Sequence, residues 1–185
     1  MVTSIPINFN REFLGACIQG DAQRQKALYD TFSPTMFAIC LRYANDYHHA
    51  EDILQEGFIK VFKRLNRFRY EGSFEGWLKK IFVHTAIEHY RKSLKFSGLE
   101  EVNTLDKHTD APLAQTDLQA ADLIQLVQQL APGYRTVFNL YAIEGYSHKE
   151  ISSMLKISVG TSKSQLARAR TTLQRRVNQL KLRVK

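Results

Sequence analysis

Apolar residues recur along most of the chain at intervals of three and four, which is the spacing of one face of a helix. The clearest stripe lies in residues 49–65, and it consists of Ala50, Ile53, Leu54, Gly57, Phe58, Val61, Phe62 and Leu65. A second long helix is expected to start at Ser73, and its inward positions are Phe74, Trp77, Leu78, Ile81, Phe82 and Thr85. No segment alternates convincingly between apolar and polar residues as a strand does, so the pattern predicts an all-α protein.

Shorter helical patterns lie on both sides of these two stripes. Further helices are expected over Arg11–Gln19, Asp21–Phe32, Pro34–Ala44, 117–130 and 132–145. Asp21 and Ser33 suit the N-cap position, and Pro34 suits the first helical position. Residues 96–116 hold too few apolar positions to fold alone. We therefore predict two small helical domains, residues 8–95 and 117–185, joined by a flexible acidic linker over residues 96–116.

The stretch Tyr146–Thr172 carries the local signals of a helix-turn-helix. Ser147 can cap a helix, and Glu150, three residues later, can accept a hydrogen bond from the Ser147 backbone N–H, which completes a capping box. A short turn, Lys156–Ser158, follows, and Ser158 can cap the second helix. The C-terminal domain is therefore expected to be a helix-turn-helix of winged-helix-like type.

The second helix of this motif has two unlike faces. Its inward positions are Ser162, Leu166, Ala169 and Leu173, and its outward positions are Gly160, Lys163, Ser164, Ala167, Arg168 and Thr171. An apolar back with a small, polar and cationic front suits the major groove of duplex DNA. Lys163 and Arg168 could reach guanine acceptors or phosphates, and the backbone N–H of Thr161 could bind a phosphate. Arg170, on the flank, is expected to contact the DNA backbone.

Charge is distributed unevenly along the chain, whose formal net charge is +8. The basic residues after position 148 are Lys149, Lys156, Lys163, Arg168, Arg170, Arg175, Arg176, Lys181, Arg183 and Lys185, against the single acid Glu150. The stretch from Leu99 to Asp122 is acidic instead. Such asymmetry favours a polyanionic partner for the C-terminal domain.

Two segments together resemble the extracytoplasmic-function (ECF) class of bacterial sigma factors. The first is residues 50–82, AEDILQEGFIKVFKRLNRFRYEGSFEGWLKKIF, and the second is residues 130–170, LAPGYRTVFNLYAIEGYSHKEISSMLKISVGTSKSQLARAR. Their order and spacing are similar to those of regions two and four of the main sigma family. The resemblance implies a non-catalytic, dissociable subunit that lets the RNA polymerase core recognise a promoter and open it.

The resemblance also implies roles for particular residues. Core docking would use an acidic patch, Glu51, Asp52, Gln55 and Glu56, on the helix over residues 49–65. Capture of the unpaired minus-ten strand would use Arg67, Phe68, Arg69, Tyr70, Lys79, Lys80, His84 and Arg91. Reading of the minus-thirty-five duplex would use Gly160, Thr161, Lys163, Ser164, Gln165, Arg168 and Arg170. At His84, His89 and Gln165 the family commonly carries asparagine, aspartate and arginine instead.

The chemistry of strand capture explains this choice of residues. Stacking of a base on an aromatic ring contributes about 1–3 kcal/mol, and cations follow the phosphate backbone. Phe74 and Trp77 lie on the apolar stripe and are expected in the core, whereas Phe68 and Tyr70 lie in the intervening loop and are the better candidates for stacking. The acidic patch has an alternative explanation, since acids early in a helix also complement its dipole.

The partners that the resemblance implies are the RNA polymerase core, through its beta-prime and beta subunits, promoter DNA in duplex and single-stranded form, and an anti-sigma factor. Cys17 and Cys40 form no CxxC motif and are expected to be reduced and buried, which favours a cytoplasmic protein. Association with the nucleoid is what the resemblance implies. Residues 1–10 lack the pattern of a signal peptide, and no apolar run reaches membrane-spanning length, so we expect no membrane insertion.

Other function classes have weaker support. His48 and His49 point in different directions on a helix, so we expect no metal, and without a glycine-rich phosphate loop we expect no cofactor. The main alternative is a transcriptional regulator that binds an operator as a homodimer through its helix-turn-helix. A helical hydrolase that uses Cys17 or the His48/His49 pair is a second alternative, but no convergent polar site accompanies those residues. The sequence therefore predicts a protein that is not an enzyme.

Overall fold

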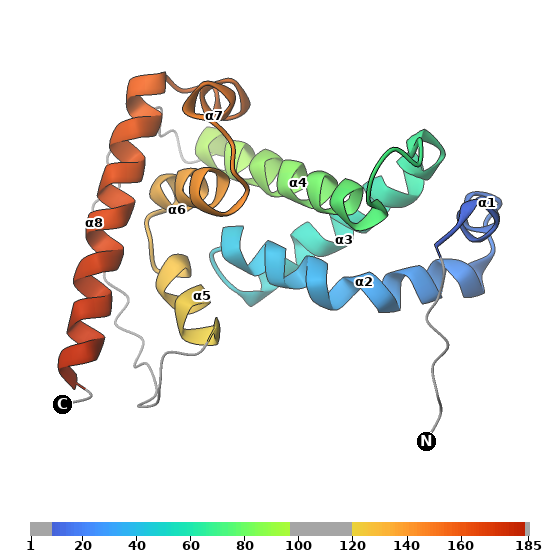
Figure 1. Ribbon diagram of the computed structural model, residues 1–185, viewed down its shortest axis with the longest axis horizontal. Helices are drawn as coiled ribbons and strands as arrows, with labels where there is room; N and C mark the ends of the chain where they lie inside the picture. Colours follow the sequence, from blue (N-terminus) through green and yellow to red (C-terminus); the bar gives the residue numbers. More distant parts are fainter. Residues whose placement is uncertain (1–8, 97–119, 184–185) are drawn as a thin grey trace.

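The computed structural model describes residues 9–96 and 120–183, and all regular structure in these two ranges is helical (Figure 1). The N-terminal half contains α1 (Arg11–Ile18), α2 (Ala22–Tyr43), α3 (Tyr47–Arg64), the 3-10 turn η1 (Leu65–Arg67) and α4 (Phe74–Phe96). The C-terminal half contains α5 (Ala120–Gln128), α6 (Pro132–Phe138), the π-helical turn η2 (Asn139–Ile143), α7 (His148–Leu155) and α8 (Val159–Arg183). The all-helical prediction is confirmed.

The core of the N-terminal half lies among α2, α3 and α4, which pack against one another along much of their length. Seven of the eight residues predicted to form the stripe of α3 are buried, and Phe62 is partly buried. The ring of Phe82 on α4 lies directly over Gly57 on α3, where a larger residue would separate the two helices. Glycine at this position therefore sets how closely α3 and α4 approach.

Helix α2 is longer than the sequence predicted. The expected boundary at Ser33 and Pro34 is wrong, because both residues lie inside one continuous helix. Proline removes one backbone donor from a helix interior, but Leu28 and Met36, on either side of the predicted break, are both fully buried in the same core. Burial of that shared face outweighs the missing hydrogen bond. The expected cap at Asp21 is present, since its carboxylate accepts a bond of 3.0 Å from the Arg24 N–H.

The helix-turn-helix of the C-terminal half follows its local sequence signals closely. Ser147 and Glu150 form the predicted capping box at the start of α7. Lys156 ends α7 in the left-handed conformation, with φ of 57°. The Ser158 hydroxyl then accepts a bond of 2.9 Å from the Thr161 N–H at the start of α8. Residues 120–183 hold no strand, so no wing accompanies the motif there.

The two halves meet where α2 ends. The Arg42 guanidinium pairs with Glu144 at 2.9 Å, and Asn139 Nδ2 donates a bond of 2.6 Å to the Arg42 carbonyl. Gln128 Nε2 donates to the carbonyl of Leu41 at 2.9 Å. These contacts place α5 and α6 against the C-terminal end of α2 (Figure 1).

The domain boundaries stay predictions. The linker expected over residues 96–116 lies, except for Phe96, outside the described ranges.

Candidate nucleic-acid interfaces

The outer face of α8 is polar, cationic and accessible. The residues predicted to face outward are all exposed, and they are Gly160, Lys163, Ser164, Ala167, Arg168 and Thr171. Ser162, Leu166 and Ala169 are buried, as the sequence predicts, while Leu173 is only partly buried. Ser162 also fixes α8 against α7, since its hydroxyl lies 2.9 Å from His148 Nδ1. The helix therefore presents its small and basic residues to solvent from a firmly held backbone.

Two residues of the predicted duplex site lie differently from expectation. The Thr161 N–H, expected to be offered to a phosphate, already donates to the Ser158 hydroxyl. Gln165 is turned inward, because its Oε1 is buried and its side-chain nitrogen lies only 3.2 Å from where a Cβ on Gly133 would stand. The resemblance to the sigma family placed Gln165 in the duplex site, whereas the close approach of α6 at Gly133 draws its side chain into the domain.

Tyrosines from outside the helix-turn-helix contact two of the arginines of α8, Arg168 and Arg170. Arg168 Nη1 donates a bond of 3.1 Å to the Tyr134 hydroxyl, and the Arg170 guanidinium lies 5.7 Å from the ring centroid of Tyr141. The Tyr141 ring in turn stacks on His148 at 4.5 Å. Sequence reasoning missed Tyr134, Tyr141 and His148, since no periodicity relates them to α8. They limit the orientations that the two cations sample.

The loop between α3 and α4 separates its two candidate aromatic residues. Phe68 is only 8% exposed and packs against Phe74 and Trp77, at centroid distances of 5.1 and 5.5 Å. The expectation that Phe68 is accessible to a base is therefore wrong, because its ring is buried against the aromatic residues of α4. Tyr70 is 37% exposed and its φ is 61°. Tyr70 is thus the accessible aromatic residue of this loop.

The cations predicted to follow the unpaired strand lie around Tyr70 and along α4. Arg67 and Arg69 in the loop are exposed, as are Lys80 and His84 on α4. The remaining two are more constrained: Lys79 pairs with Glu75 at 2.7 Å, and Arg91 is partly buried. Arg67, Arg69 and Lys80 are therefore the exposed cations among the residues of this predicted site.

The acidic patch of α3 divides into exposed and engaged residues. Asp52 and Gln55 are exposed, and Glu51 keeps 43% of its side chain accessible beside His48, whose Nδ1 is 3.4 Å away. Glu56 is different, because its carboxylate is bound within the fold. The sequence grouped all four residues by their spacing along α3. That spacing contains no information on the side chains of α4, which bind Glu56.

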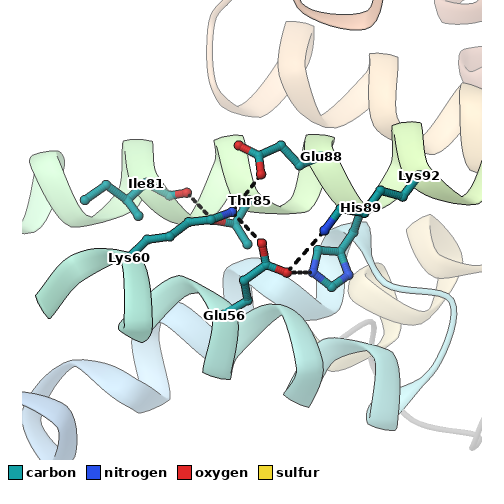
Figure 2. A network of polar contacts seen from close by, with 7 residues as sticks. All are labelled: Glu56, Lys60, Ile81, Thr85, Glu88, His89 and Lys92. Carbon is teal, nitrogen blue, oxygen red and sulfur yellow. Dashed lines mark hydrogen bonds and ion pairs between the residues drawn. The ribbon is translucent and has the colours of Figure 1, made fainter. Parts of the chain in front are cut away.

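Figure 2 shows the network that holds Glu56 between α3 and α4. Glu56 pairs with Lys60 at 2.7 Å, with His89 Nε2 at 2.7 Å and more distantly with Lys92 at 3.7 Å. Lys60 continues the network to Glu88 at 2.8 Å. Each of these pairs except Glu56–Lys60 joins the two helices, so the network clamps α3 to α4.

Comparison with known proteins decides which family these features belong to. The description "Sigma-70 region 2" matches residues 28–95, and "Sigma-70, region 4" matches residues 120–173. The chain belongs to the sigma-70 family, in its ECF class. Members of this family direct RNA polymerase to promoters when transcription starts, so the alternative of an operator-binding homodimer is not favoured.

Relatives of this sigma factor align along most of its length. It is 26% identical to the RNA polymerase sigma-H factor of Pseudomonas aeruginosa, over 88% of this chain and 90% of that protein. It is 28% identical to the ECF RNA polymerase sigma factor SigW of Bacillus subtilis, over 88% and 93% respectively. The fold is similar to that of the sigma factor RpoE from Bartonella quintana, solved in complex with the anti-sigma factor NepR, with a TM-score of 0.50 at 21% identity, covering 83% and 96% of the two chains.

The cysteines of this sigma factor are unsuited to nucleophilic chemistry. Cys17 and Cys40 are both buried, and burial raises the pKa of the Cys40 thiol to about 12. A thiol with so high a pKa stays protonated near neutral pH, whereas the thiolate is the nucleophile.

Within residues 9–96 and 120–183, no helix has both the length and the apolar character needed to cross a membrane.

Removal of the Glu56 charge is expected to destabilise this sigma factor in a pH-dependent way. Hydrogen bonding from Lys60, the largest cause, helps to lower the pKa of the Glu56 carboxyl from 4.5 to about 2. A carboxyl whose pKa is lower in the folded state stabilises above its unfolded pKa and loses that effect as the pH falls through the folded pKa. Because Glu56 is about one third exposed, we expect Glu56→Gln to cost only about 1 kcal/mol at neutral pH.

Urea unfolding of the wild type and of Glu56→Gln across a pH series measures this effect. The difference in free energy of unfolding should be largest at neutral pH and should shrink as the pH falls from 4.5 towards about 2. Asp30→Asn is the matched control, since Asp30 forms an exposed pair with Lys26 that is worth less than about 0.5 kcal/mol. A difference that is constant with pH would show that Glu56 acts through packing and not through its charge.

Proposed function

We propose that this sigma factor contacts a promoter at two places, with α8 in the minus-thirty-five duplex and the Tyr70 loop on the unpaired minus-ten strand. The observation that carries the proposal is the exposed face of α8, on which Lys163 and Arg168 flank the small residues Ser164 and Ala167. Small residues let a helix enter the major groove, and basic residues bind guanine acceptors and phosphates there.

The capping at both ends of the turn supports this role for α8. A recognition helix must enter the groove at a fixed angle, and the bond from Thr161 to Ser158 together with the Ser147–Glu150 capping box holds both helices in place. Ser164 can accept a hydrogen bond from DNA while its own hydroxyl donates to the Thr161 carbonyl at 3.0 Å. Duplex contacts are proposed for Gly160, Lys163, Ser164, Arg168 and Arg170.

Strand capture is proposed for the loop that follows α3. An exposed tyrosine beside two exposed arginines, Arg67 and Arg69, combines a stacking platform with cations for the backbone. Lys80 extends the positive surface along α4, and the exposed His84 ring lies on the same helix, which gives the displaced strand a path away from the Tyr70 ring. A base pulled from the duplex would regain on the tyrosine part of the stacking that it loses.

Docking on the polymerase core is proposed for the exposed acids of α3. The dipole explanation for these acids is weak, because α3 begins at Tyr47 and its first turn holds no acid, whereas dipole effects fade within the first turn. Glu51, Asp52 and Gln55 instead form a surface suited to a basic partner. We propose the beta-prime subunit as that partner, with Glu56 contributing to the stability of the fold.

Charge reversal on this surface is expected to weaken binding to the core. Glu51→Arg combined with Asp52→Arg should lower the affinity for purified core polymerase by about tenfold or more, since like charges across an interface repel. Asp30→Arg on α2 changes the charge elsewhere and serves as the control. Affinity can be measured by fluorescence anisotropy of labelled sigma factor titrated with core. If the Glu51→Arg/Asp52→Arg variant binds the core as tightly as the wild type does, the docking surface lies elsewhere.

The remaining partners follow from the same proposal. The beta subunit is proposed to contact the C-terminal domain, and an inhibitor of the anti-sigma type is proposed to bind the free protein. NepR, bound to its own sigma factor in the Bartonella quintana complex, is a precedent for such a partner. A protein with these partners would act in the cytoplasm, at the nucleoid, and would itself catalyse no reaction.

A further inference from the structure

Helix α1 and the two residues before it, Phe9 and Asn10, lie near the loop that carries Tyr70. Phe9, just before the helix, lies 4.8 Å from the ring of Phe32 and 6.0 Å from that of Phe74. Asn10 caps the helix by accepting a bond of 2.9 Å from the Phe13 N–H. Leu14 is fully buried in the same core. The first residue of α1, Arg11, is therefore held in a defined position beside η1 and the loop after it.

The Arg11 guanidinium lies over the ring of Tyr70, 4.9 Å from its centroid. This is a cation–π contact, in which the positive charge is attracted to the electron-rich face of the ring. No carboxylate of the described residues lies within ion-pair distance of Arg11. Among the described residues, the Tyr70 ring is therefore the group that orients the Arg11 side chain.

Tyr70 has a backbone conformation that needs such support. Its φ of 61° lies in the left-handed region, which aromatic residues rarely adopt, and such residues persist only where their surroundings hold them. Phe68 provides one neighbour, with its buried ring 4.8 Å from that of Tyr70. Arg11 provides another, from a helix that lies far earlier in the chain. Strain of this kind is common where a side chain must be presented to a ligand.

We propose that Arg11 is a positioning residue for the capture of an unpaired base. Its guanidinium fixes the plane of the Tyr70 ring between α1 and Phe68, and the exposed part of the ring then receives a base of the minus-ten strand. This inference rests on the proposed function of the Tyr70 loop. It adds a residue from outside the segments that align with the sigma-70 regions, since the region 2 match begins at residue 28.

The experiment uses the full chain assembled with core polymerase. The probe is a fluorescent fork DNA whose unpaired strand is the minus-ten non-template strand of a promoter located by mapping transcripts after induced expression. Anisotropy gives its affinity for the wild type, Arg11→Gln, Arg11→Lys and Tyr70→Ala. We expect Arg11→Gln to weaken binding about fivefold and Arg11→Lys to retain most of the affinity, as a cation–π contact requires. Arg24→Gln, on α2, is the control and should bind as the wild type does.

A double variant separates positioning from an independent contact. In the Tyr70→Ala background, Arg11→Gln should cause no further loss, because the ring that it orients is gone. Losses that multiply would overturn the proposal and assign Arg11 a separate contact with DNA. Tighter binding of Arg11→Gln would also overturn it, since the arginine would then compete with the base.

The same series keeps this inference distinct from the proposed function on which it rests. If Tyr70→Ala binds the fork as tightly as the wild type, the assignment of the loop to strand capture fails. If Tyr70→Ala weakens binding and Arg11→Gln does not, only the role of Arg11 fails. Affinity for a fully duplex minus-thirty-five probe should be equal in every variant, and a general loss there would indicate damage to the fold and contradict a specific role.

Discussion

Replacing Gly57 by alanine is expected to lower the free energy of unfolding by about 2–3 kcal/mol, the upper part of the range for overpacked cores. A Cβ at this position would stand 2.3, 2.6 and 2.9 Å from three carbons of the Phe82 ring. Phe82 is fully buried and packs edge-on against Phe58 at 5.1 Å, so its ring cannot move aside without disturbing α3 again. Alanine would favour the helical state by about 1 kcal/mol, but the clash is the larger effect.

Two other helical glycines provide matched controls for this prediction. A Cβ on Gly15 in α1 would meet nothing within 4 Å, and one on Gly76 in α4 would come no closer than 3.7 Å to Ser73. Gly15→Ala and Gly76→Ala should therefore be neutral or stabilise by up to about 1 kcal/mol. Urea unfolding followed by circular dichroism measures all three. Equal stability of Gly57→Ala and the controls would mean that α3 and α4 are further apart than the structure places them.

Combined replacement of Lys163 and Arg168 by alanine is expected to weaken recognition of the minus-thirty-five element by about a hundredfold. Each contact to a base edge contributes about 1–3 kcal/mol, and the two residues lie on the same exposed face of α8. Of the two, Arg168 is held in place by Tyr134, so its loss should relax the base preference at one position. A residue that contacts only phosphate would instead reduce the salt dependence of binding.

Competition between promoter variants, measured with the assembled polymerase at several salt concentrations, distinguishes these two effects. Lys63→Ala on α3 is the control for loss of an exposed positive charge and should leave the minus-thirty-five preference unchanged. If the Lys163/Arg168 double variant initiates at the same promoters with the same preference, α8 is not the recognition helix.

The parts of the fold that the sequence predicts are those decided by neighbouring residues. The stripe of α3, the capping box at Ser147 and the turn before Ser158 all depend on positions within a few residues of one another. Burial, capping and left-handed turns of this kind leave their pattern in the local sequence. The helix-turn-helix could therefore be placed to the residue.

The errors arise where distant elements meet. Ser33 and Pro34 look like a helix start, but the shared core of α2 keeps the helix continuous. Phe68 lies in a loop and is nevertheless buried, because Phe74 and Trp77 of α4 accept its ring. Glu56 is engaged by His89, which lies 33 positions away, and Gln165 is drawn inward beside Gly133. No local pattern contains these contacts.

The residues that sequence reasoning missed share this property. Arg11 reaches Tyr70 from another helix, and Tyr134 reaches Arg168 across 34 positions. Each is a single polar or aromatic residue whose type and spacing carry no signal of the contact that it makes. Only the packing of α1 on η1 and of α6 on α8 brings them to the predicted sites.

The central claim is that this chain makes core polymerase start at particular promoters by binding one duplex and one unpaired element. Transcription with purified chain and purified core on fragments of genomic DNA tests it directly, with permanganate used to detect unpaired thymines. We expect transcripts from discrete start sites that share two upstream elements, together with reactive thymines at the nearer element. Failure to bind the core, or binding to duplex DNA with no polymerase-dependent opening, would contradict it.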